Sequence, residues 1–427
     1  MTLIDHHSVK LSAGRSQRLK EAVLASFYEP AFEVQARLAE FTSDDWERIL
    51  FWLDISGLAL YLLDRLTRLE LETCLPESIR IRLEESLRNN CERTADLFRE
   101  ASAISRKMEL QHISFALLKG ITLTPESVPD CTLRSQTDLD FLVAASDASA
   151  AKSVILEFGY ALRALSGKTI EFKAGSLSKP DIRNMYRVHS QRALELHLLA
   201  RSENSKGSNR DRLARAQARC FHGVMIPALA PADALVQQGL HLFKHLCGEH
   251  TRASWVLEFW RYVQSRRNDV EFWNEVRSVA ETEPQASIAL GASTLLATLA
   301  FRGEFAPESL TRWTTDRLPL PVRLWIETYG RRVLMAGSPG NKLYLILRQE
   351  LPQGREMRAN MRRLVFPLHL PPSITHGEPG EGLVARLGRC RIEICHVFAR
   401  MFFHLVEGLK YAIESSRWQR RLTEAAR

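Results

Sequence analysis

The apolar pattern of the chain changes character twice, near Ile113 and again after Pro231. Outside these two points, apolar residues recur at the three- and four-residue spacing that is typical of amphipathic helices. Between them lie short apolar runs bounded by glycine, proline and aspartate, which favour strands. The pattern therefore predicts an α+β fold, with a small mixed β-sheet core embedded in N- and C-terminal helical regions.

We expect four segments along the chain. They are an N-terminal helical region at 1–104, the sheet-containing core at 105–205, a helical region at 206–350, and a C-terminal segment at 351–427 that prolines interrupt before a basic amphipathic helix. Strands are predicted for the runs at 113–120, 137–143, 161–165, 169–174 and 192–200. The dense apolar positions of 46–66 predict one largely buried helix.

Composition excludes several classes of protein. Apolar residues make up 45% of the 427 residues, too many for a collagen-like or broadly disordered chain. The seven cysteines are scattered without a CxxC pair, so neither a disulfide framework nor a zinc ribbon is expected. The longest uncharged run, Pro284–Phe301, is shorter than the ~20 apolar residues of a membrane span and predicts a buried helix. The start has no apolar signal region, so we expect a cytoplasmic protein without a transmembrane segment.

Two aspartates begin the run TDLDFLV at 137–143. In a strand, residues i and i+2 point to the same face, so Asp138 and Asp140 would lie side by side. Two neighbouring carboxylates repel each other and are costly to desolvate unless a cation lies between them. A hard divalent cation such as Mg²⁺ (or Mn²⁺) fits this pair, although a solvated strand start would also contain such residues.

A third carboxylate lies in the apolar run RALELHLLA at 192–200. Glu195 and His197 share one face of that predicted strand, while leucines fill the other. We predict that Glu195 completes a metal site on a neighbouring strand. The alternative is a salt bridge from Glu195 to Arg183, Arg187 or Arg192. His197 would bind nucleotide or water near the metal, or serve as a hydrogen-bonded structural histidine.

These residues together resemble the uncharacterised nucleotidyltransferase family of the DNA-polymerase-β-like superfamily. The similarity rests on motifs within about 113–200, which are Leu118-Lys119-Gly120, Arg134, Asp138-Leu139-Asp140, Gly159-Tyr160, His189 and Glu195-Leu196-His197. The helical front half, the region around His250 and the segment Arg363–Pro367 also look like that family.

The resemblance implies a set of site residues. Asp138, Asp140 and Glu195 would be the catalytic metal-binding carboxylates, and Lys119 and Gly120 would occupy the turn that holds the triphosphate. The superfamily has serine after this glycine, whereas this chain has Ile121. Lys119 and Arg134 would then supply positive charge to the phosphates. Arg134 could also pair with the site when metal is absent.

The function implied is transfer of a nucleoside monophosphate from an NTP to an unidentified acceptor, with release of pyrophosphate. The acceptor could be a small molecule, a protein or RNA. The alternative is a catalytically inactive nucleotide-binding or scaffold relative of the same fold, which the missing serine favours and the three carboxylates oppose.

Two further features lie outside the core. His241 and His245 have the i,i+4 spacing of metal ligands, with His250 nearby, but helix packing or a contact toward the nucleotide domain is the preferred interpretation over zinc. The C-terminal 384–427 is rich in arginine interleaved with aromatic residues. An ordinary packed helix with a solvated basic face is the first interpretation. The second is a weak peripheral contact with membrane or nucleic acid.

Overall fold

The computed structural model describes residues 6–28, 33–175, 185–187, 192–199, 212–221, 223–303, 305–352, 360–367, 371 and 382–426. Five helices precede the sheet: α1 (His6–Ala25), α2 (Val34–Ala39), α3 (Ser43–Ser56), α4 (Ala59–Arg68) and α5 (Glu77–Leu110). Helix α6 (Ala148–Glu157) lies between two strands in the sequence. The helices that follow are α7 (Pro231–Leu246), α8 (Ala253–Ser265), α9 (Val270–Thr282), α10 (Ala286–Phe301), α11 (Glu308–Thr311), α12 (Leu320–Leu334), α13 (Tyr344–Gln349), α15 (Met361–Val365) and α16 (Leu383–Ala425).

The described strands form one mixed seven-stranded sheet in the order β3-β4-β5-β2-β1-β7-β6. Their bounds are β1 (Phe115–Leu118), β2 (Asp138–Ala144), β3 (Ala161–Ser166), β4 (Thr169–Ala174), β5 (Arg192–Leu199), β6 (Gln217–Phe221) and β7 (Val224–Ala228). The central pair, β2 and β5, is parallel, and β1 and β4 flank this pair in antiparallel orientation. The predicted α+β fold is confirmed.

The two faces of the sheet differ because residues alternate along each strand. On one face, leucines and phenylalanines of β2 and β5 are buried against α5 and α6, in a core that includes Phe141, Leu194, Leu196, Ala101 and Val154. The opposite face carries the polar residues of the same strands. One face is therefore a packed core, and the other is available for chemistry.

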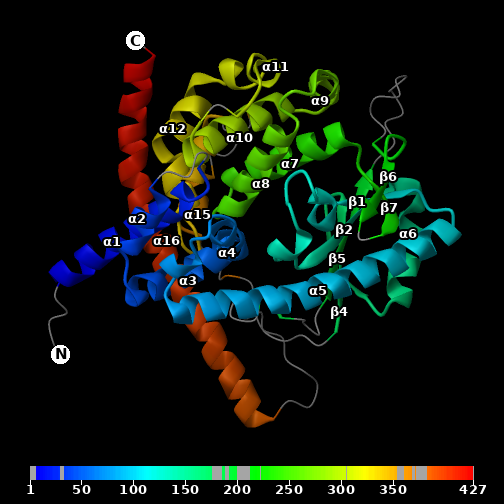
Figure 1. The fold of residues 1–427 in the computed structure, drawn as a ribbon, viewed down its shortest axis with the longest axis horizontal. Coiled ribbons are helices and arrows are strands. Elements are labelled where there is room, and N and C mark those ends of the chain that lie inside the picture. The colour runs from blue at the N-terminus through cyan, green and yellow to red at the C-terminus, as the bar shows by residue number, and fades with distance from the viewer. Residues whose placement is uncertain are drawn as a thin grey trace.

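Helix α5 joins the sheet to the helical part of the molecule. Its N-terminal half contributes Ile79 and Leu83 to the large helical core, and its C-terminal half contributes Phe98 and Ile104 to the core of the sheet. Figure 1 shows α5 running from beside α3 to the sheet. The helical core combines residues of α1, α3 and α4 with residues of α7, α8, α10 and α12. Helices that precede the sheet in the sequence therefore pack against helices that follow it.

Two expectations about individual elements need correction. The helix predicted for 46–66 is broken into α3 and α4 at Gly57, which has a positive φ of 74°. A Cβ atom there would lie 2.4 Å from the Ser254 hydroxyl, so glycine permits both the turn and the close approach of α8. The sheet also continues past residue 205, because β6 and β7 lie within the segment that was predicted to be helical.

The uncharged run at 284–301 forms α10, whose apolar residues lie mostly in the helical core. This agrees with the predicted buried helix. Among the described residues, no helix has the length and apolar character needed to cross a membrane.

Candidate active site

A cavity of about 400 Å³ lies against the polar face of the sheet. Four carboxylates line it from the strands: Asp138 and Asp140 on β2, Glu171 on β4 and Glu195 on β5. Cationic and aromatic side chains line it from the loops and from α7 and α8, and they include Lys119, Arg134, His241, Lys244, His245, Arg252 and Trp255. The cavity therefore has an acidic floor and a largely basic wall.

Strand pairing brings the carboxylates together. Asp140 lies opposite Glu195 in the parallel β2–β5 pair, and Glu195 lies opposite Glu171 in the antiparallel β4–β5 pair. The expected placement of the two acidic strands side by side is confirmed. Because paired residues of adjacent strands point to the same face, three strands present acidic groups at one level of the sheet.

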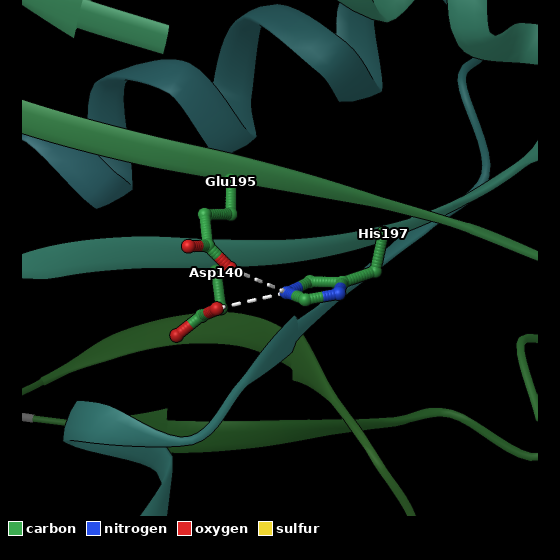
Figure 2. A group of neighbouring side chains, drawn as sticks. All are labelled: Asp140, Glu195 and His197. Atoms are coloured by element: carbon green, nitrogen blue, oxygen red, sulfur yellow. Dashed lines mark hydrogen bonds and ion pairs between the residues drawn. The ribbon is translucent and has the colours of Figure 1, made fainter. Parts of the chain in front are cut away.

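His197 links two of these carboxylates. Its Nε2 atom lies 2.9 Å from Asp140 Oδ1 and 3.3 Å from Glu195 Oε2, as Figure 2 shows. Its Nδ1 atom lies 3.4 Å from the Thr169 hydroxyl, which fixes the ring orientation. Burial alone would lower the pKa of His197, but the hydrogen bonds to Asp140 and Glu195 raise it above its ordinary value.

One ligand atom from each of Asp140, Glu195 and His197 lies within 4.8 Å of the others. Among the described residues, this is the group whose donor atoms come close enough to hold one metal ion, and His241 and His245 are not part of it. Asp138, which was predicted to be a metal ligand, also lines the cavity but lies outside this group. The donor set is rich in oxygen, which suits a hard divalent cation.

Lys119 is a cation in direct contact with the acidic floor of the cavity. Its Nζ atom donates to Asp140 Oδ1 at 3.0 Å. Burial would raise the pKa of Asp140, but the hydrogen bond from His197 and the charge of Lys119 together lower it to about 2. Asp140 is thus held ionised.

Asp138 has a different environment. Burial and the neighbouring charge of Asp140 raise the pKa of Asp138 to about 6, against the opposing effect of Lys119. Within the described ranges, Asp138 and Glu171 form no ion pair. A cation entering the cavity would therefore meet carboxylates whose charge is incompletely neutralised.

The turn after β1 has an unusual backbone. Lys119 and Gly120 have positive φ values of 50° and 49°. A Cβ atom on Gly120 would lie 2.1 Å from the Gln136 amide nitrogen, so a larger residue there would displace the Gln136 side chain. Ile121, the residue that follows Gly120, is buried in the core of the sheet. Its side chain therefore packs away from the cavity.

Arg134 lines the cavity, but the expectation that it pairs with the strand carboxylates is wrong. Its Nε donates to Glu258 Oε1 at 3.2 Å, and the Tyr61 hydroxyl donates to the same carboxylate at 3.0 Å. Lys119, not Arg134, pairs with Asp140. Glu195 likewise pairs with His197, whereas Arg187 and Arg192 pair with Glu85 and Glu100. His189 and Arg183 lie outside the described residues.

Three aromatic rings gather on the helical wall. The ring centroids of His241, His245 and Trp255 lie 4.3–5.0 Å from one another. Burial and the charge of Lys119 lower the pKa of His241 to about 2, and burial and Lys244 lower that of His245 to about 4. Both histidines are therefore neutral near pH 7. Their position agrees with the preferred interpretation of a contact toward the core.

Sequence reasoning did not single out Thr169, Glu171, Lys244 or Arg252 as site residues. A signal for Glu171 was present, because the alternation of TIEFKA places Thr169 and Glu171 on one face. The pairing of β4 with β5, which brings that face to the carboxylates, is a tertiary feature. The contribution of α7 and α8 likewise depends on how the helical core packs.

A comparison with curated proteins finds no match. One solved structure to which the chain is similar is an antigenic nucleotidyltransferase-like protein from Paracoccidioides brasiliensis. The similarity has 12% sequence identity and a TM-score of 0.28, over 45% of this chain and 90% of that chain. At this TM-score the likeness carries no argument about function.

A family comparison gives a stronger result. Residues 42–302 match the family described as "Uncharacterised nucleotidyltransferase". This range includes the sheet, the acidic floor of the cavity, and both helices of its basic wall. The match extends over more than half of the chain, and the protein therefore belongs to this family of uncharacterised nucleotidyltransferases.

Proposed function

We propose that the protein is a metal-dependent nucleotidyltransferase that transfers a nucleoside monophosphate from an NTP to an unidentified acceptor. The observation that carries this proposal is the facing arrangement of an acidic floor and a basic wall in one cavity. A triphosphate needs cations around its oxygens, and a divalent ion bound to it needs carboxylates. The arrangement also supports membership of the DNA-polymerase-β-like superfamily.

Asp140 and Glu195 are the residues that would hold Mg²⁺ or Mn²⁺, with His197 or Asp138 adding a further ligand. The close approach of the donor atoms of Asp140, Glu195 and His197 fits such an ion. When bound, a divalent ion supplies charge neutralisation for the phosphates and lowers the pKa of a coordinated hydroxyl. The protein itself keeps Asp140 ionised through Lys119 and His197, so the ligand is ready at neutral pH.

The basic wall would position the triphosphate. Lys119 lies at the boundary between floor and wall, where its ammonium group can turn from Asp140 to a phosphate oxygen without leaving the cavity. Lys244 and Arg252 add a point charge and a planar guanidinium from α7 and from the residue before α8. Because Ile121 packs into the core, the triphosphate would be held by these cations instead of by a serine hydroxyl.

The ring cluster of His241, His245 and Trp255 offers a surface for the nucleobase. His241, His245 and Trp255 are uncharged rings, so the nearby cations do not repel them, and such rings can stack on a nucleobase. Since the rings line the cavity that the carboxylates line, a nucleotide could contact both at once. The base would then lie against α7 and α8 while the phosphates face the sheet.

The buried Ile121 also favours the second candidate function, a nucleotide-binding or scaffold relative without catalysis. One experiment separates the two. The purified protein is incubated with each of the four α-³²P-labelled NTPs and Mg²⁺ or Mn²⁺, in a lysate of the source organism freed of small nucleotides, beside the Asp140→Ala variant. Label transferred to an acceptor by the wild type alone supports the enzyme. Metal-dependent NTP binding without transfer supports the scaffold, and absence of metal-dependent binding contradicts both.

A further inference from the structure

The C-terminal helix α16 is 43 residues long and has two different faces. One face packs on the helical core through Tyr411 and Trp418, and Phe403 is buried there too. Polar contacts secure it, since Trp418 Nε1 donates to Glu350 at 3.1 Å and Arg400 pairs with Glu249 at 3.0 Å. The helix is therefore a fixed part of the fold, and Figure 1 shows its N-terminal part projecting beyond the rest of the molecule.

The other face carries an exposed apolar stripe. Eight large apolar side chains of α16 are each 54–68% exposed, and six of them form the centre of this stripe: Leu387, Ile394, Phe398, Phe402, Leu405 and Leu409. Their spacing of three, four or seven residues places them on one side of the helix. They extend over roughly 34 Å at ~1.5 Å per residue. Single exposed apolar residues are ordinary, but a continuous stripe marks an interaction surface.

The charge beside the stripe is positive. Between Arg386 and Lys410 the helix has five basic residues and two acidic ones. Arg400 and Lys410 pair with Glu249 and Glu407, whereas Arg386 and Arg391 are exposed near the projecting end. The whole chain also has a formal net charge of +8. Such a helix, with arginines around an apolar face rich in leucine and phenylalanine, suits an anionic lipid surface.

Charge disfavours a coiled coil with a second copy of the chain, although Leu387 and Ile394, and Phe398 and Leu405, are each seven residues apart. A parallel pair of these helices would bring the exposed Arg386 and Arg391 of both copies together, and like charges beside a seam repel each other. A membrane-spanning role is unsuitable as well, because no described helix is apolar enough to span a bilayer.

We propose that the stripe-bearing part of α16 lies in the plane of an anionic phospholipid surface. The six apolar side chains would enter the boundary between headgroups and acyl chains, and the arginines would contact the phosphates. This arrangement leaves the packed face of α16 on the protein and requires no change in the fold. It is independent of the chemistry proposed for the cavity.

The test is co-sedimentation of the full-length protein with vesicles. We expect binding to phosphatidylcholine vesicles that contain 30 mol% phosphatidylglycerol, and much weaker binding to phosphatidylcholine alone. Replacing two exposed phenylalanines, in the double variant Phe398→Ser/Phe402→Ser, should raise the lipid concentration for half-binding at least about tenfold. Arg386→Glu/Arg391→Glu should weaken binding to the anionic vesicles specifically.

A matched control is Leu110→Ser/Leu165→Ser. It removes two leucines that are 72% and 71% exposed elsewhere on the surface. This control should bind vesicles as the wild type does, and all variants should keep the wild-type melting temperature. The proposal is overturned if the wild type ignores anionic vesicles or if the phenylalanine variant binds them normally. It is also overturned if ultracentrifugation shows a dimer, or a salt-sensitive RNA complex, that the phenylalanine variant alone loses.

Discussion

The carboxylates of the helical part and those of the sheet cavity have different partners. In the helical part, five buried carboxylates each form an ion pair with at least one arginine: Asp45, Asp54, Asp233, Glu258 and Glu414. Tyrosine hydroxyls add hydrogen bonds to Asp54 and Glu258. These charges are neutralised within the fold, as the cost of desolvation demands.

On the sheet, four carboxylates line one cavity, and none of them forms an ion pair with an arginine in the part of the chain that the structure describes. Asp140 has Lys119 and His197, Glu195 has His197, and Asp138 and Glu171 have no ion pair within the described residues. The same chain thus neutralises its structural acids and leaves its cavity acids partly uncompensated. This difference supports the proposed binding of an external cation by the cavity acids.

The largest expected effect concerns the acid that lies at the centre of the cluster. Asp140→Asn removes one metal-binding charge, and nucleotide transfer should fall at least about a thousandfold, which corresponds to ~4 kcal/mol of transition-state stabilisation. The measurement is the rate of pyrophosphate release with saturating Mg²⁺. A variant with more than a tenth of the wild-type rate would remove Asp140 from the catalytic machinery.

Replacing a structural acid should lower the stability of the fold, whereas replacing a cavity acid should not. Glu258→Gln leaves the Arg134 guanidinium buried without its counter-charge, so the free energy of unfolding should fall by about 3 kcal/mol. Asp138→Asn should leave the stability unchanged or raise it, because the raised pKa shows that its charge is disfavoured in the fold. Urea denaturation of both variants with EDTA present makes the comparison. An equal loss in both would erase the distinction between the two regions.

Metal should stabilise the wild type through the cavity acids. At a free Mn²⁺ concentration of about 100 times the dissociation constant, the free energy of unfolding should rise by ~2.7 kcal/mol. The increase should disappear in Asp140→Asn and remain in the control Asp233→Glu, whose carboxylate lies outside the cavity. Thermal melting at increasing Mn²⁺ gives the result, and an increase in melting temperature that survives Asp140→Asn would place the metal elsewhere.

The aromatic wall should affect binding more than chemistry. Trp255→Ala removes a stacking surface, so the KM for the NTP should rise about tenfold while kcat changes little. Trp255→Phe, which keeps an aromatic ring, should recover most of the affinity. Steady-state kinetics of both variants decide this. If kcat falls and KM does not, Trp255 acts on the reacting groups and not on the base.

A final test concerns an exception in the helical part. Lys342 is buried and its Nζ donates to the carbonyl oxygens of Leu364 and Val365 at 2.6 Å, and burial lowers its pKa to about 8. Above pH 8 the folded state loses this proton while the unfolded lysine keeps it. The stability of the wild type should therefore rise with pH, relative to Lys342→Met, between pH 8 and 10. A parallel pH profile for the two proteins would contradict the lowered pKa.

Much of this could be predicted from the sequence because it depends on local periodicity. The alternation around Asp138 and Asp140 and around Glu195 and His197 indicated two strands with acidic faces. The family resemblance rested on the same residues. The predicted α+β class, the five strands at 113–200 and the buried helix at 284–301 also follow from short-range apolar spacing.

Other features were decided by tertiary structure. The pairing of Arg134 with Glu258 joins residues 124 positions apart, so no local pattern could separate it from a phosphate contact. The break at Gly57 depends on the close approach of Ser254. The role of Glu171 depends on the register of β4 against β5, and the aromatic wall depends on where the helical core places α7 and α8.

The exposed stripe of α16 shows the same division. The sequence alone determined that the C-terminal segment forms a basic amphipathic helix, because amphipathicity is a property of residue spacing. Only the packing of the helix could show that its apolar residues are divided between a buried face and an exposed one. The sequence determines which residues are apolar and how they are spaced along a helix. Which of them meet another surface depends on contacts between segments far apart in the chain, and only the tertiary structure decides those.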